Sequence, residues 1–493
     1  MKAFCLAIDL VNADKPTASL AFLAGVCEHV GVEYECASIN VEMLRILDRQ
    51  QFQSLYESIK LGTENSWLPK IDPAMNNLVK NIKKVNPDVL LVSFFSFMQL
   101  NLGKYFLNLV KAEMPNLEIL AGGPGIYAET VTGKTNGSIL CEQGAIDYYV
   151  LGEGDEILPA FLLGQRELLG LNSRVTKFES WVPQIDDLDK KYILPSYKKI
   201  DFSLYHNLEA KQNGVVTIST SRGCVRACTF CDISKSWPKF RFRKGANVAD
   251  EIVKHWQDTG ISNFYISDSL INGSLKTFKE FNQAMIQLKQ QRPELAEFSY
   301  NGMFIVRDRK SHNEEFFANM ATAGCESIAI GVETGSDRLR AEMDKKYTLE
   351  DLDWHMAMCQ KYKIRNVLLM FVAHPKETAE DFQLTLDLLD RYQKYIIDET
   401  IIGINHSGVY ELIPGTPDWD HREETGVVIT SDVNDIRINW VNVKNPLLTI
   451  KERILRDLAF RKHAANLRYS MPYTQRYIQY LKNVNPAFIP MSD

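Results

Sequence analysis

The chain has 493 residues, of which 45% are hydrophobic and 24% are charged, and its formal net charge is −6. This length predicts several domains, and the mildly acidic balance disfavours a general binder of nucleic acid or of an anionic membrane. No apolar run is long enough to span a membrane, and the run at residues 3–8 is too short for a signal-peptide core. We therefore expect a cytoplasmic protein.

Residues 1–165 alternate strand and helix patterns. Buried strands are predicted at 2–8, 34–40, 87–97, 117–125 and 146–156, with helices between them. Runs rich in valine and leucine are typical of parallel strands that are covered on both faces, so we predict a doubly wound, Rossmann-like α/β domain. Ligands of such sheets bind beyond the carboxyl ends of the strands. Three glycines fall at one such end, either as a plain tight turn or as a ligand contact: Gly122, Gly123 and Gly125. Their spacing is not the dinucleotide fingerprint.

Residues 166–212 are polar and contain prolines, and we predict a linker there. A second series of six strands, each followed by a helical stretch, runs from residue 213 to residue 420. This rhythm predicts a partial, TIM-like (β/α)6 barrel whose catalytic groups lie at the carboxyl ends of the strands. Residues 421–493 form a small helical extension, with a helix that starts at the Thr449 cap and a second, aromatic helix around Tyr473, Tyr477 and Tyr480. The extension could cover the barrel mouth, contact another subunit or pack against the barrel.

The stretch "SRGCVRACTFCDIS" places three cysteines within eight positions, directly after the first barrel strand: Cys224, Cys228 and Cys231. Three thiolates can hold three irons of a 4Fe–4S cluster and leave the fourth iron open to a substrate or cofactor. A structural zinc site is the alternative, and it needs a further ligand such as His206 or His255. The other six cysteines stand singly in strand-like or helix-like stretches, as small buried hydrophobic residues do.

The motif C-x-x-x-C-x-aromatic-C, with Phe230 as its aromatic residue, resembles the signature of the radical S-adenosylmethionine (SAM) enzymes. The stretch "SIAIGVETGSDRLRAEMDKKYT" is similar to that family's fourth-strand pattern, and "GVYELIPGTPDW" is similar to its sixth. Two departures stand out: "YISDSLI" replaces the usual Gly-Gly-Glu after the second strand, and His374-Pro375 replaces glycine-proline after the fifth. The resemblance implies SAM contacts by residues at these strand ends: Phe230, Ser267, Asp268, Arg307 and Glu333. A solvated side chain remains the alternative for Arg307.

Residues 1–165 resemble the cobalamin-binding domain that precedes the barrel in one large radical SAM subfamily. The resemblance implies that cobalamin lies at strand ends with small residues: Ser93, Ser96, Gly122, Gly123 and Gly125. The loop at 9–15 lacks the Asp-x-His-x-x-Gly motif whose histidine ligates cobalt in cobalamin mutases. His29 is the only histidine of this domain, so we expect no protein imidazole below the cobalt.

Together these resemblances imply a radical SAM enzyme of the class B type with a 4Fe–4S cluster, SAM and cobalamin, which methylates an unactivated carbon of a small molecule or peptide. An electron donor such as flavodoxin or ferredoxin would reduce the cluster. A cobalamin domain that binds nothing, in an enzyme of rearrangement or oxidation, is one alternative. Methylthiolation and a non-catalytic iron–sulfur or zinc scaffold are two others. The basic and aromatic segment 235–245 is interpreted as a charged loop beside an anionic cofactor, with a nucleic-acid patch as the alternative.

Overall fold

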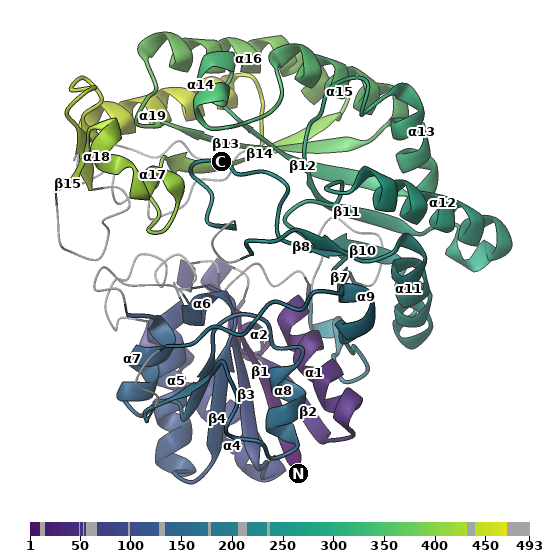
Figure 1. Ribbon diagram of the computed structural model, residues 1–493, viewed down its shortest axis with the longest axis vertical. Helices are drawn as coiled ribbons and strands as arrows, with labels where there is room; N and C mark the ends of the chain where they lie inside the picture. Colours follow the sequence, from purple (N-terminus) through teal and green to yellow (C-terminus); the bar gives the residue numbers. More distant parts are fainter. Residues whose placement is uncertain are drawn as a thin grey trace. The chain divides into compact units, whose positions relative to one another are not determined.

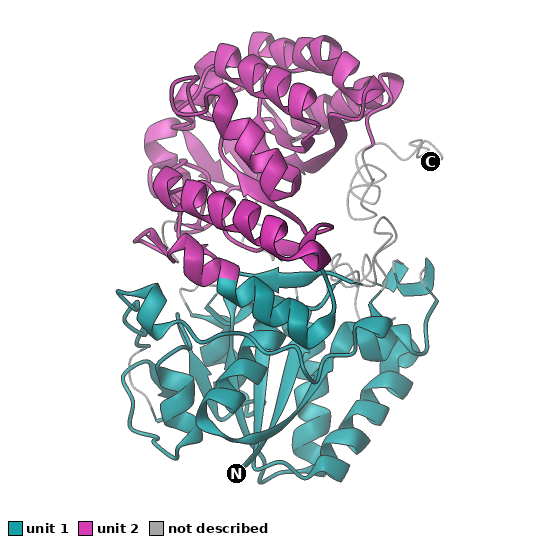
Figure 2. Ribbon diagram, turned by 90° about the vertical axis from the view of Figure 1, so that its right-hand side faces the viewer, with its two compact units in different colours: residues 1–218, 250–263 teal, residues 219–249, 264–493 magenta. Residues whose placement is uncertain are grey.

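The chain folds into two compact units, residues 1–218 with 250–263 and residues 219–249 with 264–493 (Figure 2). The computed structural model describes residues 1–9, 15–48, 50–52, 54–55, 67–96, 99–127, 134–175, 179–205, 214–233, 237–430 and 439–470. None of the helices within these ranges has the length and apolar character of a membrane span. His206 and the predicted aromatic helix around Tyr477 lie outside the described residues.

The first sheet confirms the predicted doubly wound fold. It has the order β2-β1-β3-β4-β5-β6, of which Figure 1 labels β1 to β4. The pairing is parallel from β2 to β5, and the edge strand β6 is antiparallel. The strand order reverses between β1 and β3, and the crevice at such a point is where doubly wound sheets bind ligands. The edge strand comes from the predicted linker. The strands are β1 (Lys2–Ile8), β2 (Glu33–Ser38), β3 (Val89–Phe94), β4 (Glu118–Gly122), β5 (Tyr148–Val150) and β6 (Leu171–Ser173).

Helices cover the first sheet, and alternate side chains of β1 enter a core shared with α4 and α5. Gly31 ends α1 in the left-handed conformation. Thr17, at the N-cap position of α1, makes no side-chain cap, and its hydroxyl donates to Asp9 Oδ2 at 3.5 Å. The helices are α1 (Ala18–Val30), α2 (Ile39–Leu44), α4 (Leu68–Val85), α5 (Leu100–Glu113), α6 (Pro124–Tyr127), α7 (Asn136–Glu142), α8 (Ile157–Leu162), α9 (Leu188–Lys191) and the 3-10 helix η2 (Phe202–Leu204).

The second sheet confirms the partial barrel. Its order is β14-β13-β12-β11-β10-β7, so neighbours in the sheet are also neighbours in this series of strands, and the pairing from β11 to β14 is parallel. The carboxyl ends of parallel strands meet at one edge, which gathers the loops that follow them. The strands are β7 (Val216–Ile218), β10 (Asn263–Ile266), β11 (Ser299–Phe304), β12 (Cys325–Glu333), β13 (Arg365–Val372) and β14 (Ile401–Val409).

Helices follow the barrel strands, and two of them begin at capping boxes, Thr348 with Asp351 and Thr378 with Asp381. The first helix of the series begins at Gly245. A side chain at Gly245 would overlap the backbone of Phe281, so close packing sets this helix start. The helices are α11 (Gly245–Thr259), α12 (Leu275–Gln291), α13 (Glu314–Ala323), α14 (Asp337–Glu342), α15 (Leu349–Tyr362), α16 (Ala379–Ile397), α17 (Pro417–Asp420), α18 (Arg422–Thr425) and the 3-10 helix η3 (Pro293–Leu295).

The C-terminal extension packs against the barrel. It contains a two-stranded antiparallel sheet of β15 (Val427–Ile429) and β16 (Trp440–Asn442), followed by α19 (Ile450–Asn466). Thr449 caps α19, as predicted, by accepting a hydrogen bond from Glu452 N at 3.1 Å. This helix contacts β13, β14 and α16. The sequence left three roles open for this extension, and the described residues show one of them, packing against the barrel.

Candidate functional site

A short hairpin leads into the three-cysteine loop (residues 224–231). Its strands are β8 (Ser221–Arg222) and β9 (Arg241–Phe242), which pair antiparallel. Gly223 follows β8 with φ +85°, and a Cβ there would lie 2.6 Å from Lys239 O. Glycine is needed at this turn because the left-handed backbone and the neighbouring strand both exclude a side chain. Arg243 also braces the hairpin, since its Nη1 donates to Ser219 O at 3.0 Å.

Asp268 holds the segment just before the cysteines. Its carboxylate accepts hydrogen bonds from Thr220 N at 2.8 Å, Ser219 Oγ at 3.1 Å and Ser221 Oγ at 2.8 Å, and from Thr220 Oγ1. Burial raises the pKa of this carboxyl group. The side chain is 3% exposed and does not line the cavity described below. In this structure Asp268 therefore positions the entry to the three-cysteine loop, and its predicted contact with SAM stays a prediction.

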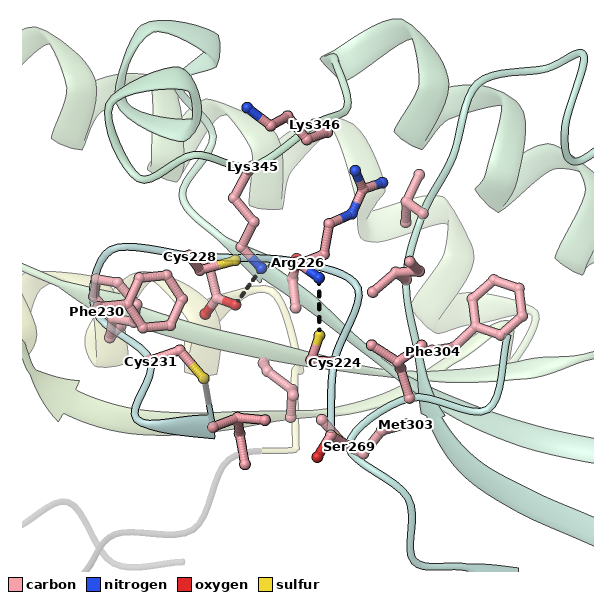
Figure 3. A pocket seen from close by; sticks show the side chains of 18 of the residues that line it. Cys224, Arg226, Cys228, Phe230, Cys231, Ser269, Met303, Phe304, Lys345 and Lys346 are labelled. Carbon is pink, nitrogen blue, oxygen red and sulfur yellow. Dashed lines mark hydrogen bonds and ion pairs between the residues drawn. The ribbon is translucent and has the colours of Figure 1, made fainter. Parts of the chain in front are cut away.

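The backbone of the three-cysteine loop is fixed at its middle. Thr229 N donates to Met343 O at 3.3 Å, and Thr229 O accepts from Asp418 N at 2.9 Å. Within the loop, Cys231 N donates to Cys228 O at 3.1 Å. The cysteine side chains are partly exposed and turn toward a shared cavity of about 460 Å³, which we call the cysteine cavity (Figure 3).

The donor set of this cavity suits an iron–sulfur cluster. Burial raises the pKa of all three thiols, that of Cys231 to about 12, so metal binding must displace their protons. Three thiolates, with no fourth cysteine and no histidine among the described residues that line the cavity, fit a 4Fe–4S cluster with one open iron. Among the described residues, no three His, Cys, Asp or Glu side chains lie where they could hold a single metal ion. The geometry of the described residues therefore does not support the zinc alternative. His206, one of its candidate ligands, lies outside the described residues.

Glu333 enters the cysteine cavity from the end of β12, beside a buried lysine (Figure 3 shows their ion pair as a dashed line). Lys345 Nζ lies 2.7 Å from Glu333 Oε1 and donates to Gly331 O at 3.1 Å. Glu333 has φ +64° at a register shift between β12 and β13, and such strained residues concentrate at functional sites. Burial of Lys345 opposes its charge, but Glu333, Tyr347 and Cys228 raise the pKa of the ammonium above its ordinary value. A side chain at Gly331 would overlap this ion pair.

Aromatic rings form one wall of the cysteine cavity. Phe230 packs edge-on against Phe371 at a centroid distance of 5.2 Å, and Phe371 meets Tyr410 at 5.6 Å. Lys345 Nζ lies 5.6 Å from the centroid of Phe230. Phe230 thus lines the cysteine cavity, and its contact with SAM stays a prediction. Sequence reasoning missed Lys345, whose only signal is the basic pair in "DKKYT" twelve positions after Glu333.

Besides Asp268, two more predicted SAM residues do not line the cysteine cavity. Ser267 is exposed beyond the end of β10. Arg307 donates from Nη2 to Asn272 O at 3.2 Å and Gly273 O at 2.9 Å. Its Nε is buried, and no described residue accepts a hydrogen bond from it. Burial lowers the pKa of this guanidinium, and Arg226 adds to the effect. Their contacts with SAM remain predictions.

The predicted cobalamin residues gather at the carboxyl edge of the first sheet. Ser93 pairs with Gly122 across β3 and β4. A Cβ at Gly122 would meet no atom within 4 Å, whereas one at Gly123 would lie 2.6 Å from Phe94 O and one at Gly125 would lie 2.6 Å from Ser96 O. Gly123 and Gly125 therefore allow the chain to pack on itself. Gly122 leaves open space where a ligand could lie.

Two buried polar side chains that the sequence did not single out lie at the same edge. Gln99 Oε1 accepts from Ser96 N at 3.0 Å, while no described residue accepts a hydrogen bond from its Nε2. Asp9 follows β1 and accepts from Ser38 Oγ at 2.8 Å, and burial raises the pKa of Asp9 to about 7. An unpaired buried amide and open space at Gly122 fit a polar ligand such as the amide-rich corrin ring.

Three of the six remaining cysteines, scattered in the sequence, lie together in the first unit. Cys5 and Cys36 are register partners in β1 and β2, and Cys5 Sγ lies 3.7 Å from Cys27 Sγ. Cys5 and Cys27 are fully buried in the core. Sulfur atoms in direct contact leave no room for the irons of a second cluster, which methylthiolation would need.

Comparison with known families matches residues 218–389 to the radical SAM superfamily. Residues 218–389 form a radical SAM domain. This family implies a 4Fe–4S cluster and SAM as the cofactors of the domain. The three-cysteine loop and the Glu333–Lys345 pair both lie inside the radical SAM domain, whereas Tyr410 and Asp418 lie beyond it.

Relatives extend the likeness to the first unit. An uncharacterized methyltransferase of Pyrococcus horikoshii is 23% identical over 383 residues, which are 75% of this chain and 75% of that protein. The radical SAM methyltransferase TsrM from Kitasatospora setae, with cobalamin and a [4Fe–4S] cluster bound, superposes with a TM-score of 0.62 at 19% identity, over 89% of this chain and 82% of that one. The cobalamin-dependent SAM radical enzyme OxsB, with aqua-cobalamin bound, gives 0.66 at 16% identity, over 98% and 71%. These likenesses show a shared fold that includes both units.

Proposed function

We propose that this chain is a cobalamin-dependent radical SAM methyltransferase that acts on an unactivated carbon of a small molecule or peptide. The observation that carries the proposal is the presence, in one chain, of the cysteine cavity and of a doubly wound unit with an open switch point. A methyltransferase among the relatives and cobalamin in two structures of the same fold support it. Rearrangement or oxidation with an empty first unit is the alternative that the experiment below separates.

The radical SAM domain supplies the residues that would hold the cluster and SAM. When bound, these cofactors supply a 5′-deoxyadenosyl radical that takes a hydrogen atom from the substrate, and methylcobalamin supplies the methyl group. Cys224, Cys228 and Cys231 would bind three irons. Lys345 places positive charge beside an anionic cluster and holds Glu333, whose carboxylate would accept hydrogen bonds from SAM. The aromatic wall around Phe230 would shield one side of the reacting groups from water.

The first unit would hold cobalamin at the switch point between β1 and β3. Ser93, Ser96 and Gln99 offer polar contacts there, and Gly122 leaves space. The chain after β1 must turn back to start the parallel strand β2, so α1 runs antiparallel to the strands and ends at the opposite edge. His29 lies in that last turn. It therefore cannot ligate cobalt at the carboxyl edge, and spectra of the cobalamin-loaded protein should show no nitrogen coupling from His29.

The cluster would receive its electron from a low-potential donor such as flavodoxin or ferredoxin. We expect the electron donor to be needed for turnover with natural reductant and to be replaced by dithionite in the test tube. The donor's identity rests on the chemistry of the family, whose clusters need one-electron reduction.

The test is anaerobic reconstitution with iron, sulfide and hydroxocobalamin, followed by metal, sulfide and corrinoid analysis. The proposal predicts stoichiometric corrinoid and transfer of labelled methyl from SAM. Gly122→Val provides a sharp variant, because an added Cβ meets no described atom within 4 Å and the side chain would occupy the open space. It should lose corrinoid and keep iron and thermal stability. Wild-type protein that cleaves SAM but takes up no corrinoid would leave rearrangement or oxidation as the function.

A further inference from the structure

The turn 373–378, which follows β13, adopts a strained conformation that its own side chains hold. Ala373 has φ +66°, which is unfavourable for a residue with a side chain. Its N–H donates to Glu377 Oε2 at 3.0 Å, and Glu377 N donates to His374 O at 2.8 Å. Lys376 N donates to His374 Nδ1 at 3.2 Å. A strained turn persists only where surrounding contacts fix it.

Those surrounding contacts come from the C-terminal extension. Arg456 of α19 places Nη1 at 2.9 Å from Glu377 Oε1, 3.3 Å from Glu377 O and 3.1 Å from Thr378 O. The side chains of Arg456 and Glu377 are only 8% and 2% exposed. Asn442 Nδ2 donates to Pro375 O at 2.9 Å, and Asn445 Nδ2 donates to Glu377 O at 3.1 Å. One guanidinium and two amides therefore clamp the turn from outside the radical SAM domain.

The same turn reaches the back of the three-cysteine loop. Because His374 Nδ1 accepts a hydrogen bond, its Nε2 carries the proton and donates to Asp418 Oδ2 at 3.3 Å. Tyr410, a lining residue of the cysteine cavity, donates to the same oxygen at 2.7 Å. Asp418 N in turn donates to Thr229 O, next to Cys228, at 2.9 Å. A continuous set of contacts thus joins Arg456 to the three-cysteine loop.

We propose that Arg456 is a positioning residue for the SAM site, and that residues 439–470 are a working part of that site rather than an appendage. Arg456 and Glu377 hold the turn, the turn holds His374 and Asp418, and these hold the loop and Tyr410. The inference rests on the proposed function only in taking SAM as the ligand of the cysteine cavity. It does not depend on methyl transfer.

Arg456→Lys tests the clamp, because all three contacts come from Nη1, which lies one bond farther along the side chain than a lysine Nζ. Lysine also lacks the Nε that contacts Glu452 Oε1 at 3.1 Å. The matched control is Arg461→Lys on the same helix. Arg461 is also buried and lies 2.8 Å from Asp457, which pairs with His406 of β14. Both variants remove buried guanidinium contacts of α19.

The first readout is hydrogen exchange on the full-length protein without cofactors. Arg456→Lys should speed exchange in the peptide that spans residues 372–378 by about tenfold or more. The strand β12 should exchange as in wild type. Arg461→Lys should leave the turn unchanged. Equal acceleration of the turn in both variants would mean that α19 acts only by general docking, and would overturn the proposal.

The second readout is equilibrium binding of SAM to the reconstituted protein. Arg456→Lys should raise the Kd for SAM about tenfold while iron content stays at the wild-type level. If Arg456→Lys folds poorly, a second pair of variants with smaller effects on stability tests the same proposal. Asn445→Ala removes one amide from the turn, whereas Thr449→Ala removes the cap of α19 and touches no residue of the turn. Asn445→Ala should weaken SAM binding several-fold, and Thr449→Ala should lower only the melting temperature.

Unchanged SAM binding in both Arg456→Lys and Asn445→Ala, with the turn loosened, would refute the positioning role. Normal SAM binding in wild type without any methyl transfer would instead refute the proposed function and leave this inference standing.

Discussion

Replacing Lys345 by methionine should destabilise the radical SAM domain strongly, because it leaves the carboxylate of Glu333 buried without its partner. The two side chains are only 13% and 9% exposed, and their charged atoms lie 2.7 Å apart. Removal of one member of a buried ion pair costs about 3–5 kcal/mol, most of it the penalty for the remaining charge. We therefore expect Lys345→Met to lose about 3 kcal/mol of unfolding free energy at neutral pH.

The double variant Lys345→Met with Glu333→Gln should recover most of that loss. It carries no buried charge, and a neutral amide beside a thioether costs about 1 kcal/mol in unmade hydrogen bonds. The assay is urea unfolding of the cofactor-free protein under anaerobic conditions, followed by circular dichroism for wild type, both single variants and the double variant. If the losses of the two single variants simply add in the double variant, the buried pair does not exist as described.

The same variants separate stability from SAM binding. Glu333→Gln should weaken SAM affinity by about one to two powers of ten through the loss of a charge-assisted hydrogen bond, with unchanged iron content. The double variant should be stable yet bind SAM equally poorly. Unaltered SAM binding in Glu333→Gln would place this carboxylate outside the SAM pocket.

Three further outcomes are expected. Changing any one of the three cluster cysteines to alanine should abolish the brown chromophore and reductive SAM cleavage, whereas Cys359→Ala, in the buried core, should leave both intact; absorbance and product analysis check this. Asp268→Asn should reduce iron content, because an amide cannot accept all the hydrogen bonds that fix residues 219–221. If the variant loses SAM affinity but keeps its full iron content, Asp268 contacts SAM directly instead. Asp9 has a pKa raised by burial to about 7, so between about pH 4 and 7 the folded state keeps a proton that the unfolded state has lost, and stability falls as pH rises. This group contributes a slope of about 1.4 kcal/mol per pH unit in that window. Asp9→Asn should flatten it in denaturation curves, and an unchanged pH profile would show that Asp9 is ionised in the folded state.

Features that depend on a few neighbouring residues could be predicted from the sequence. Each of the capping boxes at Thr348 and Thr378 can be recognised from four consecutive residues of the sequence, and both form in the structure. The six barrel strands follow from apolar runs bounded by polar turns. The three-cysteine loop also needs only its own spacing to be found. Thr17 shows the limit of such reasoning, because it stands at the N-cap position of α1 but makes no side-chain cap, and its hydroxyl donates to Asp9, eight residues earlier.

Contacts between distant residues could not be predicted from one sequence. In the sequence, Lys345 looks like one of two surface lysines. In the structure it pairs with Glu333, which lies at a register shift between β12 and β13. The buried face of α19 carries Arg453, Arg456 and Arg461, which a hydrophobic pattern assigns to solvent. Glu377, the partner of Arg456, lies 79 positions away along the chain. Only the fold shows that this charged face is an internal contact.

Reductive cleavage of SAM tests the central claim most directly. Protein reconstituted anaerobically with iron and sulfide is mixed with SAM and dithionite, and 5′-deoxyadenosine is measured by mass spectrometry, with Cys228→Ala as the control. The account predicts 5′-deoxyadenosine from the wild-type protein and none from the variant. A wild-type protein that is colourless and holds one zinc, or one with a full complement of iron and sulfide that forms no 5′-deoxyadenosine, would contradict it.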